Sequence, residues 1–427
     1  MKRFFKFSII IILIVTTSFA VVKVSRKYSL NILKDDIDCK VITKSCEKAK
    51  AIATDDKGNI YVAYNDYIKS IDSEGKEKVL YKNKDMSIED IVFYNDKIIF
   101  ISKDSIQSFS LDDGKVNTLY SGIPESGNNI SRKLLLSKNN LLLSVGAVTN
   151  SGISEGDKVD LSPIDITLTG VNYGNLKTGA FKRAGEKSEE GEKIQRSSFG
   201  NACLYSFGLK KKGSSLYASG IRGITGMDLD SKGNIIAIFS GFKNEGLRPV
   251  NRDKDYIYKI ARGKWYGWPD FSGGDPITSP RFKGNELVKA LLKDPPSKVV
   301  ESPLYQHETV DSLRELSIDI NGKLLDKDSY LFWDRDEEVL SALSPSGVYC
   351  KILKLNEKSK IEDIIYNKDG FLILDSVTGC IYSIHEKEGL LGFKLPLEIW
   401  IFVFMLSFIL LCIIVLKWMK KENKKYF

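Results

Sequence analysis

The stretch DDKGNIYVAYNDYIKSIDSEGK, Asp55–Lys76, decides the fold. It reads as a glycine turn, an alternating strand, a second turn at Asn65 and Asp66, another strand, and a third turn at Glu74 and Gly75. Turns of this kind need residues that tolerate positive φ, and the flanking strands favour β-branched and aromatic side chains. The stretch therefore predicts short antiparallel strands joined by tight turns.

Units of the same kind recur along the chain. They are Phe93–Lys115, Leu136–Gly146, Leu229–Gly241, Asp319–Asp334 and Tyr366–Ile384. Their turns fall at positions 58, 96, 140, 233, 322 and 370, which are 38, 44, 93, 89 and 48 residues apart. A repeat of about 40–45 residues with four strands is one blade of a β-propeller. The two long intervals contain missed blades or large insertions, so the repeat predicts an all-β propeller of six to eight blades.

Both ends of the chain carry apolar segments beside basic residues. Phe7–Val22 has no charge and follows a basic start, as in a signal peptide or a signal anchor. Ile399–Leu416 is also uncharged, is long enough to cross most of a bilayer, and is followed by lysines. Because positive residues mark the cytoplasmic side, we expect a cytoplasmic C-terminus and a propeller outside the cell membrane.

These segments divide the chain into four parts. We expect a signal peptide or signal anchor at residues 1–27, an extracytoplasmic propeller at 28–388, a transmembrane helix at 395–418 and a basic cytoplasmic tail at 419–427. Of the net charge of +8, three charges come from the first six residues and four from the tail after Leu416. The region between them is close to neutral, which argues against a nucleic-acid partner.

The chain has six cysteines and no CxxC pair. In an oxidising exterior, Cys39 with Cys46 and Cys350 with Cys380 are conceivable disulfides, although connectivity does not follow from sequence. Cys412 lies inside the apolar C-terminal segment, where we expect it to act as a small apolar residue.

The most specific stretch is GLRPVNRDKDYIYKIARGKWYGWPDFSGGDPITSPRF, Gly246–Phe282. It resembles the glucose/sorbosone dehydrogenase family, in particular its sorbosone-dehydrogenase-like branch. Four more segments resemble the family in the same order, namely Val145–Ile153, Ser162–Gly174, Leu216–Met227 and Leu304–His307. The resemblance runs from Lys50 to Ile384 and implies a six-bladed propeller with two large insertions.

The family resemblance also implies a chemistry. In the family, pyrroloquinoline quinone (PQQ) held with calcium takes a hydride from a sugar or related alcohol, while a histidine removes the hydroxyl proton. The residues that we expect around the cofactor are Thr149, Asn150, Arg222, Arg248, Asp253, Tyr266 and Trp268. Arginine forks suit the carboxylates of the quinone, and flat aromatic rings suit stacking.

A structural interpretation of the same residues stays open. The aromatic side chains Trp265, Tyr266 and Trp268 could close the insertion as a small core, and the arginines could pair with Asp253 or Asp255. The two aspartates also offer the oxygen ligands that calcium prefers, although their spacing matches no EF-hand loop.

The chain departs from the family at two positions. The family's histidine precedes the strand that leads into VGAVTNSGI, and the corresponding stretch, Asn128–Gly146, contains no histidine. The only histidines are His307 and His385, and the asparagine that follows the family's arginine is replaced here by Gly223. Two functions therefore remain open: a quinone-dependent dehydrogenase, or a propeller that binds a carbohydrate, an envelope component or a protein partner without redox chemistry.

Overall fold

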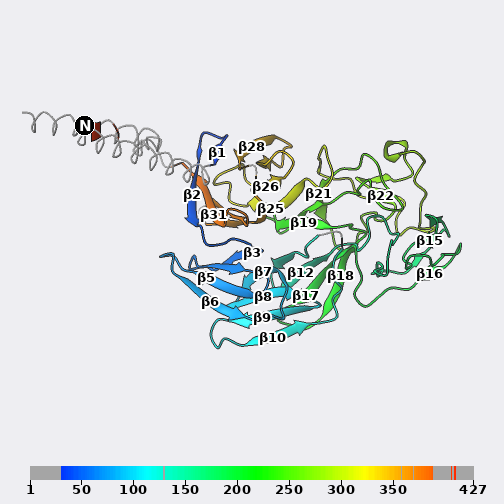
Figure 1. Cartoon of the computed structure of the whole chain (residues 1–427), viewed down its shortest axis with the longest axis horizontal. Coiled ribbons are helices and arrows are strands. Elements are labelled where there is room, and N and C mark those ends of the chain that lie inside the picture. The colour runs from blue at the N-terminus through cyan, green and yellow to red at the C-terminus, as the bar shows by residue number, and fades with distance from the viewer. Residues whose placement is uncertain are drawn as a thin grey trace, which may run out of the picture. The chain divides into compact units, whose positions relative to one another are not determined.

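Six antiparallel sheets of four or five strands follow one another along the described chain (Figure 1). The computed structural model describes residues 30–127, 130–356, 358–368 and 370–387, together with residues 405, 408 and 409. We number the sheets as blades one to six. Blade one consists of β3 (Ala51–Thr54), β4 (Ile60–Ala63), β5 (Tyr67–Ile71) and β6 (Glu77–Lys82). Blade two consists of β7 (Ile88–Tyr94), β8 (Lys97–Ser102), β9 (Ser105–Ser110) and β10 (Val116–Tyr120). Blade three consists of β11 (Leu134–Ser137), β12 (Asn140–Val145), β17 (Cys203–Gly208) and β18 (Ser214–Ser219).

The remaining blades include the first two strands of the described chain. Blade four consists of β19 (Ile224–Leu229), β20 (Ile235–Phe239), β21 (Tyr256–Ile260) and β24 (Tyr305–Gln306). Blade five consists of β25 (Leu313–Asp319), β26 (Ser329–Asp334), β27 (Val339–Leu343), β28 (Tyr349–Lys354) and β1 (Asn31–Ile32). Blade six consists of β29 (Ile361–Asn367), β30 (Gly370–Asp375), β31 (Cys380–Glu386) and β2 (Ile37–Thr43). The all-β, six-bladed propeller expected from the resemblance is confirmed for the described chain.

The ring closes through strand pairing between the two ends of the propeller. The outermost strand of blade six, β2, pairs with β31 in an antiparallel register that sets Ile37 opposite Glu386, and Figure 1 shows the two strands side by side. Because the ladder joins residues that are far apart in sequence, it ties the second and the last strand of the described chain together without a covalent link.

The innermost strands β3, β7, β11, β19, β25 and β29 surround the central channel, and each contacts the next. We call the face at which these strands begin the upper face and the face at which they end the lower face. Four of the strands carry a β-bulge near their upper end, at Glu89, Thr225, Glu315 and Glu362. A β-bulge redirects the side chain of the extra residue. These four residues therefore depart from the regular alternation of their strands, at the upper end of the channel.

Buried aspartates on the inner strands join neighbouring blades. Asp90 of β7 accepts a hydrogen bond from the Leu134 amide of β11 at 2.6 Å, and Asp363 of β29 accepts one from the Ile52 amide of β3 at 2.8 Å. Burial raises the pKa of both aspartates, to about 7 for Asp90. Their bonds to the neighbouring inner strand hold the blades in register.

Two large insertions build a layer beside blades three and four. The first connects β12 with β17 and contains the short strands β13 (Ile166–Thr167), β14 (Asn172–Tyr173), β15 (Thr178–Gly179) and β16 (Lys193–Ile194). The second connects β21 with β24 and contains β22 (Phe271–Ser272), β23 (Asp275–Pro276) and the 3-10 helix η1 (Pro280–Phe282). Their apolar side chains form one core that includes Phe181, Phe242, Trp265, Trp268 and Phe282. The aromatic residues of the second insertion therefore pack as a core.

The expected disulfides do not form, because all five cysteines of the described chain are free thiols. Each expected pair combines a residue on an outer strand with a residue in the core. Cys39 of β2 and Cys350 of β28 are partly exposed, whereas Cys46 and Cys380 are fully buried.

The expected membrane segments, at residues 1–27 and 395–418, lie outside the described residues apart from Met405, Phe408 and Ile409, which are helical, and Cys412 and the tail at 419–427 also lie outside them. Among the described residues, no helix is both long and apolar enough to span a membrane.

Candidate functional site

A cavity of about 300 Å³ opens at the upper end of the central channel. Its walls come from residues 130–133 before and at the start of β11, 311–315 at the start of β25 and 359–362 at the start of β29, together with Lys243 and Arg335. Small-molecule sites typically have about 300 to 1,000 Å³. This upper cavity therefore has room for a ligand of modest size, held by several blades at once.

Three cations converge on one carboxylate in the wall of the upper cavity. The Lys243 ammonium lies 3.1 Å from Asp311, the Arg335 guanidinium lies 3.2 Å from it, and Arg314 also pairs with it. Burial alone would raise the pKa of Asp311, but Arg314 and Lys243 outweigh burial and lower it. A single carboxylate neutralises one of the three positive charges, so the cluster retains an excess that suits an anionic ligand.

Arg222 is the predicted cofactor residue that keeps a donor free. Its side chain is buried, with Nε donating to the Asn150 carbonyl at 3.2 Å and Nη1 donating to Ser240 Oγ at 2.9 Å. Nη2 is buried and has no hydrogen-bond partner in the described chain. Burial lowers the pKa of Arg222, which Asp255 and Asp253 oppose. An unpaired buried donor is costly unless a ligand satisfies it, so Nη2 fits a carboxylate.

Gly223 is the position at which the family's asparagine is missing, and its surroundings explain the difference. A Cβ atom at this residue would lie 2.3 Å from Cδ1 of Ile130. Ile130 is itself buried and lines the upper cavity. An isoleucine side chain therefore occupies the space next to Gly223, and an asparagine side chain would not fit without repacking.

Arg248 is held entirely by the protein. Its guanidinium donates to the carbonyls of Ser151, Pro269 and Lys289 at 2.8 to 3.2 Å, and Nη2 lies 2.6 Å from Asp270 Oδ1. These bonds engage Nε and both terminal nitrogens, and the side chain is 1% exposed. The structure places Arg248 as the anchor of the second insertion, away from the upper cavity.

The aromatic candidates are likewise packed in the core. Trp268 is buried, meets Phe181 edge to face at 5.7 Å and donates from Nε1 to the Asn150 carbonyl at 3.3 Å. Tyr266 is buried in a separate core and donates to the Lys259 carbonyl at 3.0 Å. Neither side chain lines the upper cavity, so the structural interpretation of these rings matches their surroundings.

Asp253 and Asp255 act as structural acceptors and pair with neither arginine. Asp253 accepts hydrogen bonds from Tyr256 at 2.6 Å and Ser272 at 2.7 Å. Asp255 accepts the Ser312 amide at 2.8 Å, which ties blade four to blade five. Burial raises the pKa of both aspartates, and these hydrogen bonds oppose the shift. Among the described residues, no group of three or more acidic, histidine or cysteine side chains is arranged to hold a metal ion.

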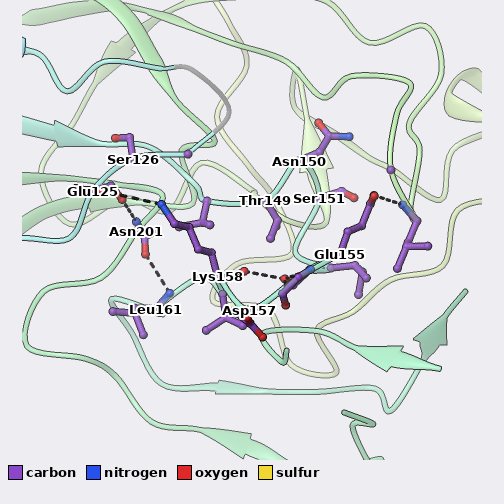
Figure 2. A pocket seen from close by; sticks show the side chains of 18 of the residues that line it. Glu125, Ser126, Thr149, Asn150, Ser151, Glu155, Asp157, Lys158, Leu161 and Asn201 are labelled. Atoms are coloured by element: carbon purple, nitrogen blue, oxygen red, sulfur yellow. Dashed lines mark hydrogen bonds and ion pairs between the residues drawn. The ribbon is translucent and has the colours of Figure 1, made fainter. Parts of the chain in front are cut away.

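Thr149 and Asn150 lie on a second, larger cleft of about 980 Å³ at the upper face (Figure 2). Asn150 donates to the Lys243 carbonyl at 2.7 Å, and Thr149 Oγ1 donates to Asp160 at 2.6 Å. The Asn150 backbone thus receives Arg222 while its side chain holds the loop that carries Lys243. Asn150 therefore links this cleft to the wall of the upper cavity.

The cleft is polar and carries excess negative charge. Its acidic lining residues are Glu125, Glu155, Asp157 and Glu245, against a single basic residue, Lys158. Hydroxyl and amide side chains, including Ser126 and Asn201, stand among them, as Figure 2 shows. Hydroxyl, amide and carboxylate groups are the hydrogen-bonding partners that a sugar needs.

The floor of the upper cavity is an ion pair across the channel. Lys133 of blade three lies 2.5 Å from Glu315 of blade five, and both side chains also line a lower cavity of about 640 Å³. Burial works against the charge of Lys133, but Glu315 and Asp90 outweigh it and raise the pKa of Lys133. Burial also raises the pKa of Glu315, to about 8, and Lys133 opposes this shift. The pair lines both cavities and separates them.

We expect Lys133→Met to lower the free energy of unfolding by about 3–5 kcal/mol, because it leaves Glu315 buried without its partner. The double variant Lys133→Met with Glu315→Met should recover most of this loss, since it removes both charges. Urea unfolding of the purified chain tests both. A single variant as stable as the wild type would contradict the assignment of the pair as the channel floor.

His307 lies outside the upper cavity. Its Nε2 is 3.5 Å from Asp334 Oδ2 and its Nδ1 is 3.4 Å from the Tyr305 hydroxyl, in the contact between blades four and five. His385 faces Gly370 in the ladder of blade six. In the described chain, no imidazole lines the upper cavity.

Sequence reasoning missed the cations of the upper cavity. Lys243 lies between β20 and β21, Arg314 at the start of β25, Arg335 after β26 and Lys360 before β29, so no local motif joins them. The available signal was weak: a basic residue stands close to the start of several inner strands, as in DSLREL and KSKIED.

The comparisons with known proteins place the fold. No protein-family model and no curated protein matches the sequence. A solved structure of the Trichoderma reesei carbohydrate-active enzyme family AA12 matches with a TM-score of 0.59 at 12% identity, over 84% of this chain and 98% of that chain. The PQQ domain of pyranose dehydrogenase from Coprinopsis cinerea matches with a TM-score of 0.55 at 14% identity, over 84% and 98%.

A PQQ-bound aldose sugar dehydrogenase from Streptomyces coelicolor also matches, with a TM-score of 0.53 at 14% identity, over 82% of this chain and 99% of that chain. This chain has the propeller fold of PQQ-type sugar dehydrogenases. At this level of identity the likeness concerns the fold, so the function has to be argued from the upper cavity and the cleft beside it.

Proposed function

We propose that this protein is a membrane-tethered, extracytoplasmic propeller that binds a carboxylate-bearing cofactor in the upper cavity and oxidises a sugar or a related alcohol. One observation carries the proposal: Lys243, Arg314 and Arg335 share the single carboxylate Asp311 in the wall of the upper cavity. Asp311 also acts electrostatically on buried Arg222, whose Nη2 has no partner in the described chain. This is a site for an anion with several carboxylates, which is the chemical class of PQQ.

The residues present fit PQQ in charge and size. Lys243 and Arg314 line the cavity and would hold its carboxylates, and Ile130 would provide an apolar contact where the family has asparagine. Arg222 is not among the lining residues, and its unpaired Nη2 would add a further donor. Calcium has no ready set of side-chain ligands in the described chain, so we assign it none. When bound, the quinone would supply the hydride acceptor for the C–H bond of an alcohol.

The chain's own residues have to take the hydroxyl proton. Since no imidazole lines the cavity in the described chain, we assign this role to Glu362, whose carboxylate lies in the wall of the upper cavity, 2.7 Å from Lys360 and 3.1 Å from Ser376 Oγ. The polar cleft beside Asn150 would orient the sugar through its hydroxyl, amide and carboxylate groups.

The test is a binding and turnover assay on the full chain in detergent. PQQ is titrated with and without calcium, and reduction of an electron-accepting dye is followed with a panel of aldoses and polyols. We expect saturable binding and turnover for the wild type. The variant Glu362→Gln should still bind PQQ, with a turnover rate lowered by about 10²–10⁴-fold. Absence of quinone binding at high micromolar concentration would end the proposal.

A second function is favoured by the missing imidazole and by Ile130 beside Gly223. In this case the propeller binds a carbohydrate, an envelope component or a protein partner without redox chemistry. This second function would be supported if the chain binds a sugar or glycan through the Asn150 cleft but shows no turnover. If Asn150→Ala binds the sugar or glycan as the wild type does, the cleft is not the binding site.

A further inference from the structure

We propose that the lower face of the propeller docks on anionic lipid headgroups through a basic patch, which we define as Lys138, Lys210, Lys211, Lys212 and Arg262. The inference rests on the membrane tether of the proposed function. It names the face of the propeller that is turned toward the bilayer. It therefore also gives the direction in which the upper cavity points.

The fold gathers the basic patch from three separate turns. Lys138 lies in the turn between β11 and β12, the three consecutive lysines lie in the turn between β17 and β18, and Arg262 follows β21. The Leu209 amide donates to the Asn139 carbonyl at 3.0 Å, which holds the first two turns together. Arg262 donates to Ser215 Oγ at 3.3 Å and lies 4.5 Å from the centre of the Tyr217 ring.

Strand direction places all three turns on the lower face. First and third strands of a blade run the same way, from the upper to the lower face, because consecutive strands are antiparallel. The turn after β11, the turn after β17 and the residues after β21 therefore share the face opposite the upper cavity.

The charges of the patch are unneutralised within the protein. No ion pair is recorded in the described chain for any of its five residues, and Lys210, Lys211 and Lys212 are exposed. The neighbouring lower turns also carry acidic residues, namely Asp96, Asp112 and Asp113 of blade two and Asp230 of blade four, and of these Asp113 pairs with Lys115. A cluster of lysines close to an anionic bilayer is attracted electrostatically to the lipid headgroups.

The C-terminal end of the propeller leaves from the same face. β31 is the third strand of blade six, so Glu386 lies at its lower end. The residues from Lys387 to Glu398 can extend at most about 40 Å before the apolar segment begins. By contrast, Asn31 pairs with Lys354 at the upper end of β28, so the described propeller begins at the upper face and ends at the lower face.

Anionic lipid is the occupant that this geometry favours, because the tether keeps the lower face within reach of the headgroups. Docking would leave the upper cavity and the Asn150 cleft pointing away from the bilayer, open to ligands from outside. Free phosphate shares the chemistry of a lipid headgroup, and the experiment separates the two sources.

The full chain is reconstituted into vesicles of phosphatidylcholine alone or mixed equally with phosphatidylglycerol, and hydrogen exchange of residues 208–214 is measured. We expect slower exchange only in the mixed vesicles, with the effect reversed by high salt. Inorganic phosphate added to phosphatidylcholine vesicles should not reproduce it. Equal exchange in both vesicle types, or the same slowing by phosphate, would overturn the inference.

The triple variant Lys210→Glu, Lys211→Glu, Lys212→Glu should abolish the lipid effect. A matched control reverses three exposed charges of the first insertion, Lys187→Glu, Lys193→Glu and Arg196→Glu, and should preserve it. Loss in both variants would contradict a specific patch. Alkaline carbonate washing tests the tether separately: extraction of the chain overturns the proposed tether, whereas a chain that resists extraction without lipid-dependent protection overturns only the patch.

Discussion

Arg248→Met should lower the free energy of unfolding by about 3–5 kcal/mol, as large an effect as we expect from Lys133→Met. The change removes the donors of three backbone carbonyls and leaves Asp270 buried beside an apolar side chain. Asp270 still accepts the amides of Leu291 and Leu292, but amide hydrogen bonds alone do not neutralise its charge.

The measurement is urea unfolding of the purified chain by tryptophan fluorescence, which reports on Trp265 and Trp268 in the same core. Lys293→Met is the matched control, because its pair with Glu190 is largely exposed and should change stability by less than about 1 kcal/mol. If the two variants unfold alike, Arg248 is not the anchor of the second insertion.

Arg222→Ala should weaken PQQ binding by about tenfold to a hundredfold, the largest effect on affinity that we expect. A hydrogen bond to a charged group contributes about 1.5–3 kcal/mol, and Nη2 of Arg222 is one of the buried donors that the described chain leaves unpaired. The protein itself loses only the bonds to Asn150 and Ser240, so the fold should persist.

Calorimetric titration with PQQ tests this expectation, with thermal unfolding as the check on folding. Arg222→Lys should fall between the wild type and Arg222→Ala, because it keeps the charge and loses the fork. Arg262→Ala, on the lower face, is the control and should bind as the wild type does. An Arg222→Ala variant with unchanged affinity would mean that the ligand binds elsewhere.

The repeat of turns and strands was enough to predict the propeller, because each blade is a local unit whose turn residues and alternation are visible in sequence. Closure of the ring by β2 and β31 was not predicted. It joins Ile37 to Glu386, and pairing between such distant residues leaves no local pattern. The number of blades came from the family resemblance and agrees with the six sheets.

The site could be predicted only in part. Arg222 was found through its sequence motif, and its free Nη2 makes it the strongest candidate of the predicted set. Arg248 precedes β21 and Trp268 follows it, and their residue types do not reveal that both side chains are buried in contacts with the second insertion. Asp311 and its three cations escaped notice because they come from separate segments of blades four and five.

The substitution at Gly223 illustrates the same limit. In sequence it is a missing amide, whereas in the structure it is a space occupied by Ile130 from the preceding blade connection. The absence of the family's asparagine is therefore a change in packing as well as a change in polar chemistry.

A structure of the full chain determined with PQQ is the most direct test of the central claim, that the upper end of the channel is an anion site built by several blades. The account predicts the quinone in the upper cavity, with one carboxylate at Nη2 of Arg222 and another near Lys243 and Arg314. A quinone bound elsewhere on the propeller, with Asp311 and its three cations untouched, would contradict it.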